Sequence, residues 1–167
     1  MASKTLLFLL LPILSWSANF VNICNDSSGN NCCAEGMKNH DYWIMQTTGT
    51  WSEMDIECRL ESPPNSKLVV FENRGENDCL IKYLMDEYRG QTQTKYAIGL
   101  KSDDDYKGVY EWRNDNHSTP TFTNWASGYP KDNTYVFMTV GEGAGQNGKW
   151  TDTTGTEKVY GICERSK

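Results

Sequence analysis

The chain has 167 residues, of which 38% are hydrophobic, and a formal net charge of −6 at pH 7. This length predicts one ordinary domain with a sizeable core. An acidic surface repels the phosphate backbone of nucleic acids, so we expect no nucleic-acid partner.

Residues 1–17 have the pattern of a cleaved secretory signal peptide. Lys4 precedes an apolar run from Leu6 to Leu14, and small residues follow this run. The run is too short to span a bilayer, which takes about 20 apolar residues, and no later segment is apolar enough to do so. Cleavage after Ser17 or Ala18 would leave a secreted, extracellular protein without a membrane span.

A polar arm that contains cysteines is expected at residues 18–32, before a single domain at residues 33–167. Cysteines in a secreted chain predict disulfide bonds, although spacing alone allows many pairings. Zinc is a poor alternative, because the chain has only two histidines and no CxxC pair. Two sequons, at Asn25 and Asn116, are candidate glycosylation sites. The six cysteines are Cys24, Cys32, Cys33, Cys58, Cys79 and Cys163.

The first part of the domain predicts two helices and two short strands. Tyr42–Met45 is an apolar run typical of a strand. Thr50 is followed three residues later by Glu53, and this capping box predicts the start of a helix that ends before two consecutive prolines. A second strand is expected at Lys67–Phe71, and a second amphipathic helix at Glu76–Tyr88.

The second part of the domain predicts strands and one long loop. A long irregular stretch is expected at Arg113–Asn133. Two early helices and several later strands indicate an α+β domain. The strands are expected at Tyr96–Leu100, Gly108–Trp112, Tyr135–Val140, Lys149–Thr151 and Lys158–Glu164.

Several short motifs follow one another in a distinctive order. They are YAIGL, EW, FTNW, an X-Pro turn at Tyr129-Pro130, GKW-x-D and ICE, all placed after a helix with a late cysteine. Each motif alone is weak evidence, but the ordered set from about Cys33 to the C-terminus resembles a C-type lectin-like domain. The resemblance implies the C-type lectin-like fold, in which two helices flank small antiparallel sheets with a long irregular loop. It also implies a cis peptide bond in the X-Pro turn.

The resemblance further implies a disulfide between the first helix and the last strand, which here joins Cys58 to Cys163. A bridge that closes a loop of about 105 residues stabilises the fold by about 4–5 kcal/mol on the chain-entropy model. The second disulfide usual in the family is missing, because Tyr135 and Gly155 occupy the matching positions.

The four other cysteines have no settled counterpart in the family. Cys79 has three open assignments, namely a bridge to Cys32 or Cys33, a buried thiol, and an intermolecular bridge. A disulfide-linked or non-covalent oligomer is therefore among the expectations, and Cys24 has no assigned partner.

Calcium needs about 6–8 oxygen ligands. Sugar-binding members of the family supply several from a Glu-Pro-Asn or Gln-Pro-Asp triplet and from a WND motif. This chain has Tyr-Pro-Lys at residues 129–131 and Trp-Thr-Asp at residues 150–152. Lys131 repels a cation by several kcal/mol at ~4 Å, so we expect calcium to bind weakly or not at all. The weak metal candidates are Asp132, Asn133, Asp152 and, in a separate acidic run that we interpret as a solvated turn, Asp103.

The resemblance implies a secreted recognition protein, active in innate defence or adhesion, that binds carbohydrate or a protein ligand through the long loop. Tyr129 replaces a metal ligand on this loop. The candidate ligand-binding residues are Tyr129, Lys131, Asp132, Asn133 and Asp152. The tryptophans at family core or loop-anchoring positions are expected to be buried: Trp43, Trp51, Trp112, Trp125 and Trp150.

A second class of function is structural. The chain would then be a matrix, mineral-associated, venom or ice-binding component that does not bind sugar. An enzyme is not expected, because no Ser/Cys–His arrangement stands out and the Gly-rich run near residue 145 lacks a following Lys-Ser/Thr.

Overall fold

The structure is a computed structural model that describes residues 19–21, 37, 39–60, 65–87, 94–103, 105–113, 116–141 and 146–167. The predicted signal peptide and most of the predicted arm lie outside these residues. The described residues form two helices and eight strands, which confirm the α+β class. The elements are β1 (Asn19–Val21), β2 (His40–Ile44), α1 (Trp51–Leu60), β3 (Lys67–Leu68), α2 (Arg74–Glu87), β4 (Thr94–Ser102), β5 (Tyr110–Trp112), β6 (Tyr135–Val140), β7 (Lys149–Thr153) and β8 (Tyr160–Ser166).

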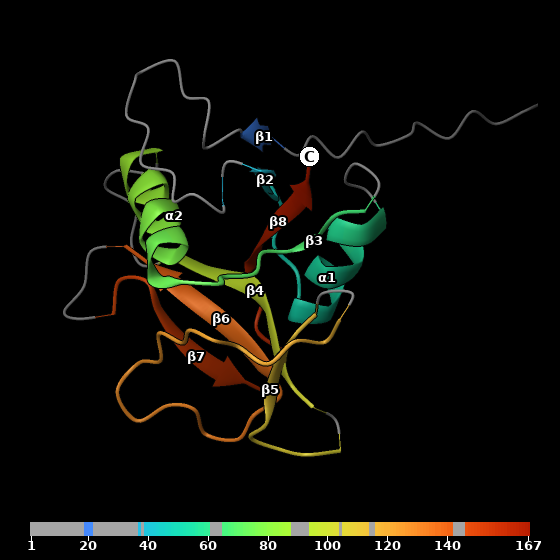
Figure 1. Cartoon of the computed structure of the whole chain (residues 1–167), viewed down its shortest axis with the longest axis vertical. Coiled ribbons are helices and arrows are strands. Elements are labelled where there is room, and N and C mark those ends of the chain that lie inside the picture. The colour runs from blue at the N-terminus through green and yellow to red at the C-terminus, as the bar shows by residue number, and fades with distance from the viewer. Residues whose placement is uncertain are drawn as a thin grey trace, which may run out of the picture.

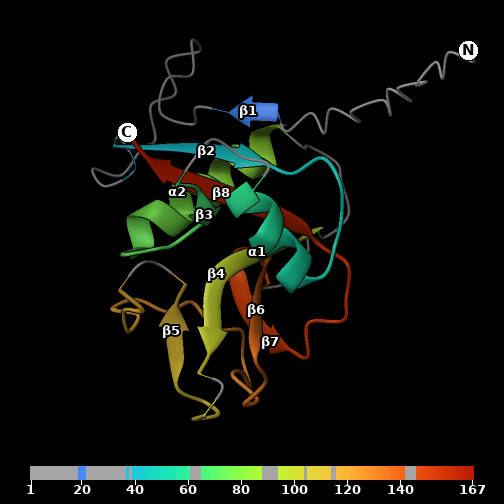
Figure 2. The ribbon, with the colours of Figure 1, turned by 90° about the vertical axis from the view of Figure 1, so that its right-hand side faces the viewer.

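The strands form one sheet in the order β1-β2-β8-β4-β6-β7, with β3 paired to β8 and β5 paired to β4. All pairs are antiparallel except β4 with β8, which run parallel. The two helices lie on opposite sides of the sheet in Figure 1. β1 and β2 lie at one end of the molecule and β4 to β7 extend toward the other (Figure 2). The C-terminal strand β8 therefore joins the two halves.

β1 and β3 differ from the sequence prediction. β1 lies inside the segment predicted as a polar arm and pairs with β2. Its three residues are too few to show the periodicity of a strand. β3 ends at Leu68, although the prediction ran to Phe71. The Val69 N–H still donates to the Ile162 carbonyl at 2.8 Å, and the Val69 carbonyl accepts from the Gly99 N–H at 2.8 Å. Val69 thus bridges β8 and β4 outside a regular ladder.

The predicted capping box starts α1. The Thr50 N–H donates to Glu53 Oε2 at 2.8 Å, and the Glu53 N–H donates to Thr50 Oγ1 at 3.3 Å. These contacts satisfy two amide groups that the first turn of a helix leaves without a helical partner. The hydrogen bond from the Thr50 backbone also lowers the pKa of Glu53.

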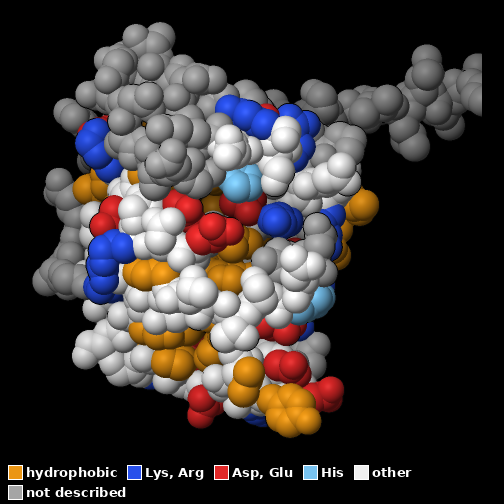
Figure 3. Space-filling model, in the orientation of Figure 1, with side chains coloured by type: hydrophobic (Ala, Val, Ile, Leu, Met, Phe, Trp, Pro, Cys, Tyr) orange, Lys and Arg blue, Asp and Glu red, His pale blue; other side chains and the backbone are white. Residues whose placement is uncertain are grey.

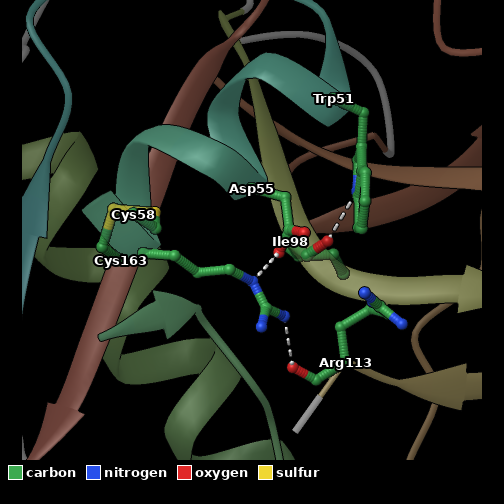
Figure 4. Close-up of polar contacts among 7 residues, drawn as sticks. Trp51, Asp55, Cys58, Ile98, Arg113 and Cys163 are labelled. Atoms are coloured by element: carbon green, nitrogen blue, oxygen red, sulfur yellow. Dashed lines mark hydrogen bonds and ion pairs between the residues drawn. A yellow bond between two sulfur atoms is a disulfide. The ribbon is translucent and has the colours of Figure 1, made fainter. Parts of the chain in front are cut away.

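The predicted disulfide holds α1 against β8. Cys58 and Cys163 are bonded, with a Cα–Cα distance of 5.5 Å, and both are fully buried. Trp51 at the other end of α1 donates from Nε1 to the Ile98 carbonyl of β4 at 2.8 Å (Figure 4). Cys79 is buried in the core between α2 and the sheet. One of its three open assignments is a bridge to Cys32 or Cys33, which lie outside the described residues, as does Cys24.

The surface mixes charged and apolar groups. Acidic side chains gather at the lower end of the face in Figure 3, over the loops that adjoin β5. Among the described residues, no helix is long and apolar enough to cross a membrane.

Glu164 is a buried carboxyl group near the end of β8, 3% exposed. It lies opposite Tyr42 of β2 and Lys67 of β3, with 3.8 Å between Lys67 Nζ and Glu164 Oε1. Burial raises the pKa of Glu164 to about 8, and Lys67 and the Val70 amide offset this only in part. The loss of hydration disfavours the carboxylate here.

We predict that the free energy of unfolding falls as pH rises from 4.5 to about 8. In this range the unfolded chain loses the Glu164 proton while the folded chain keeps it, at a cost on the order of 1 kcal/mol for each pH unit. Glu164→Gln should flatten this slope in urea unfolding measured across the range. Glu157→Gln, which removes an exposed carboxylate beside Lys95, is the control. An unchanged slope in Glu164→Gln would contradict the assignment.

Candidate functional site

The long loop is anchored to β7 near its middle. The Trp150 N–H donates to the Asn124 carbonyl at 2.9 Å, and the Ala126 N–H donates to the Trp150 carbonyl at 2.8 Å. The Asn124 side-chain amide donates to the Gly148 carbonyl at 2.7 Å. These bonds account for the buried polar groups of a segment that the sequence predicts as irregular. The residues that follow Ala126 are therefore held close to β7.

Trp150 is the centre of an aromatic cluster beneath the loop. It is fully buried, and its indole Nε1 donates to Asn77 Oδ1 of α2 at 3.0 Å. Four of the five predicted core tryptophans are buried, whereas Trp125 is half-buried and packs against the cluster. The rings around Trp150, with centroid distances of 5.5 to 6.0 Å, are Phe71, Trp112, Phe122 and Trp125.

The Asp152 carboxylate fastens the next part of the loop to β7. Its Oδ1 accepts from the Lys131 N–H at 2.7 Å. Its Oδ2 accepts from the Asn133 N–H at 2.5 Å and lies 3.0 Å from the Tyr110 hydroxyl. Asp152 is 4% exposed. We call these four residues the Asp152 clamp, in which a buried charge is compensated by three donors.

Tyr110 is the member of the clamp that the sequence analysis missed. It was predicted only as part of a strand, and alternation in β5 places it on the buried face with Trp112. Its single hydroxyl proton can be donated to Asp152 or to the Asn133 carbonyl, which is also 3.0 Å away. Burial, and then the hydrogen bond to Asp152, raise the pKa of Tyr110 well above its usual value, so the hydroxyl remains a donor at neutral pH.

The other predicted ligand-binding residues lie beside the clamp. Tyr129 is half-buried, and Lys131 Nζ lies 4.6 Å from the centre of its ring. Asp132 is exposed with φ of 58°, and Asn133 is half-buried. The Tyr129-Pro130 bond is cis, as predicted. The structure thus brings all five predicted residues together, with four on the surface of the loop and Asp152 buried beneath them.

The residues of this site do not fit a calcium ion. Calcium needs oxygen ligands with lone pairs to spare, but the Asp152 oxygens already face three protein donors. The Lys131 ammonium is also close by, over Tyr129. Across the described part of the chain, no group of three or more His, Cys, Asp or Glu side chains could hold a metal.

Asp103, the fourth weak metal candidate, stabilises the turn in which it lies. Asp103 Oδ1 accepts from the Asp105 N–H at 2.7 Å and from the Tyr106 N–H at 3.3 Å. A carboxylate that caps its own turn in this way is a common feature of exposed loops. The finding agrees with a solvated turn.

The turn between β4 and β5 touches the long loop. Gly108 has φ of 83°, and a Cβ atom there would lie 2.7 Å from Asp132 Oδ1. Tyr106 and Val109 in the same turn are 68% and 57% exposed. Neither residue was predicted to belong to the site, because the contact between turn and loop is not local in sequence. Asn116, the described sequon, is exposed, and Asn25 lies outside the described residues.

Comparisons with known proteins agree with the geometry of the fold. The family profile described as "Lectin C-type domain" matches residues 47–165. Mouse C-type lectin domain family 10 member A is 28% identical over 89% of this chain, which spans 46% of that protein. The chain therefore covers about half the length of this relative.

Two solved structures share the fold. C-type lectin CEL-I from Cucumaria echinata has a TM-score of 0.64 and 24% identity, over 78% of this chain and 91% of that one. A calcium-independent type II antifreeze protein has a TM-score of 0.59 and 16% identity, over 77% and 87% of the two chains. At these identities the likeness shows the architecture alone.

We predict that Asp152→Ala lowers the free energy of unfolding by about 2–4 kcal/mol, because it leaves the amide groups of Lys131 and Asn133 without their acceptor. Urea unfolding of the disulfide-bonded protein measures this. The matched control is Asp86→Ala, which removes a half-exposed partner of Lys82 on α2 and should cost less than about 1 kcal/mol. Equal effects of the two substitutions would show that the Asp152 clamp does not stabilise the fold.

Proposed function

This chain belongs to the C-type lectin domain family, and we propose that it is a secreted recognition protein that binds carbohydrate through its long loop without calcium. The Asp152 clamp is the observation that carries the proposal. In it, protein N–H and O–H groups bond to both carboxylate oxygens and so compete with a cation for their lone pairs. The loop keeps its position without an ion, and a preorganised loop binds at a lower entropic cost.

The exposed side of the clamp has the chemistry that a sugar needs. The Tyr129 ring offers an aromatic contact for sugar C–H groups, and the Lys131 ammonium, which lies over one face of this ring, is a donor for hydroxyl oxygens. The Asn133 side-chain amide offers both a donor and an acceptor. Asp152, which is buried, supports these residues and does not contact the ligand in this proposal. Asp132 projects from a left-handed turn at the edge of the loop.

A protein ligand is the second candidate, and the turn between β4 and β5 favours it. Tyr106 and Val109 are exposed apolar side chains next to the loop, and the contact of Gly108 with Asp132 joins the two segments. Together they widen the candidate site beyond a single sugar residue. Exposed aromatic and apolar groups of this kind are typical of protein interfaces.

The remaining sequence predictions belong to the same proposal. Residues 1–17 are proposed as a signal peptide, residues 18–32 as an N-terminal arm and residues 33–167 as the recognition domain. Asn25 and Asn116 are proposed glycosylation sites. Catalysis is not part of the proposed function, and a structural role that does not involve sugar is the alternative.

A glycan array tests the proposal. We predict the same set of bound glycans in calcium and in a chelator, and a loss of about tenfold in affinity for Tyr129→Ala and for Lys131→Ala, which remove contacts at the centre of the site. Lys82→Ala on the exposed face of α2 is the matched control. Binding that needs calcium would refute the metal-free mechanism.

An array without signal, combined with capture of a purified protein ligand that Tyr106→Ala weakens, would favour the second candidate. The absence of both would favour the structural alternative. Circular dichroism of each variant shows whether the loss of binding reflects loss of folding.

A further inference from the structure

A pocket with a basic lining lies apart from the Asp152 clamp. Its volume is about 560 Å³. The lining comes from the end of α1, from β3 and the two residues before it, from the residue after β5 and from the end of β8. No residue of the Asp152 clamp or of Tyr129–Asn133 belongs to it. The described residues that line it are Arg59, Asn65, Ser66, Lys67, Arg113 and Ser166.

Among the described residues, the charges that line this pocket leave an excess of positive charge from Arg59, Lys67 and Arg113. Of the three cations, Arg59 is partly neutralised by Asp55, whose Oδ1 lies 3.2 Å from Arg59 Nε. Lys67 faces Glu164, but burial raises the pKa of Glu164 to about 8, so this carboxyl is mostly protonated at pH 7. Lys and Arg side chains are visible over β3 and the end of β8 in Figure 3. This positive region occurs in a chain with a net charge of −6.

The arginines at the pocket are held in place and have donors to offer. Arg59 Nη2 lies 3.5 Å from the Arg113 carbonyl. The Arg113 side chain extends toward Trp51 and α1 in Figure 4. Its Nε is buried and has no hydrogen-bond partner within the described residues. Arg59 uses two of its N–H donors in the contacts with Asp55 and the Arg113 carbonyl, and a guanidinium has five such donors.

We infer that this pocket binds a sugar-sized ligand that carries a sulfate or phosphate ester. Guanidinium groups match the geometry of tetrahedral oxyanions, and Asn65 and Ser166 can bond to neutral hydroxyl groups. The volume is within the usual range of about 300–1,000 Å³ for small-molecule sites. The negative net charge opposes a long polyanion. This site is independent of the function proposed for the loop.

Titration followed by amide chemical shifts tests the inference on the full chain. The probes are glucose 6-sulfate, glucose 6-phosphate and unmodified glucose. We expect saturable shifts at Asn65–Lys67 and Arg113 with either ester and none there with glucose, and weaker binding at higher salt. The ester that binds more tightly identifies the source of the oxyanion. Absence of saturable shifts at millimolar ester, or equal shifts with glucose, would overturn the inference.

Substitutions locate the charges that matter. Lys67→Gln and Arg113→Gln should each weaken ester binding by about tenfold, since each removes a charge-assisted hydrogen bond. Arg74→Gln makes the same change of charge at an exposed position on α2 and should leave affinity unchanged. Tyr129→Ala should also leave it unchanged, which separates this pocket from the loop site. Equal affinities for Arg113→Gln, Lys67→Gln and Arg74→Gln would contradict the assignment.

Discussion

The position of the long loop depends on one buried carboxylate. Asp152 accepts hydrogen bonds from two loop amides, those of Lys131 and Asn133, and faces the Tyr110 hydroxyl of β5. Because β7 and β5 belong to the same sheet, this one side chain connects the loop to two strands. A buried anion without such donors would be strongly unfavourable, so the carboxylate and the loop conformation require each other.

Other contacts support the Asp152 clamp in holding the loop on the sheet. The Trp150 cluster fills the space below it, and the backbone bonds of Asn124 and Ala126 align the preceding segment with β7. On the other side, the disulfide between Cys58 and Cys163 keeps α1 on the sheet. The loop is thus mounted on a rigid support, and its exposed residues can serve recognition without an ion to order them.

Local signals in the sequence predicted most of the fold. The capping box of Thr50 and Glu53 marked the start of α1 within one residue, and apolar runs located β6 with its observed bounds. The order of short motifs predicted the family and the disulfide. β1 was missed because three residues carry too little pattern, and the parallel pairing of β4 with β8 depends on contacts far apart in sequence.

The residues of the candidate site could be proposed from the sequence, but their contacts could not. Motif positions pointed to Tyr129, Lys131, Asn133 and Asp152, and the structure brings them together. The sequence could not show that loop amides bond to the Asp152 oxygens, because every residue except proline has a backbone N–H and only the fold determines its direction. Tyr110 likewise gave no sign of its partner, since a tyrosine in a buried strand most often belongs to the core.

Amide hydrogen exchange of Lys131 and Asn133 tests the central claim most directly. With a chelator present, both amides should exchange far more slowly than exposed loop amides, because their hydrogens are bonded to Asp152, and added calcium should change neither rate. Fast exchange in the chelator that becomes slow on addition of calcium would contradict this account, because an ion and not the protein would then order the loop.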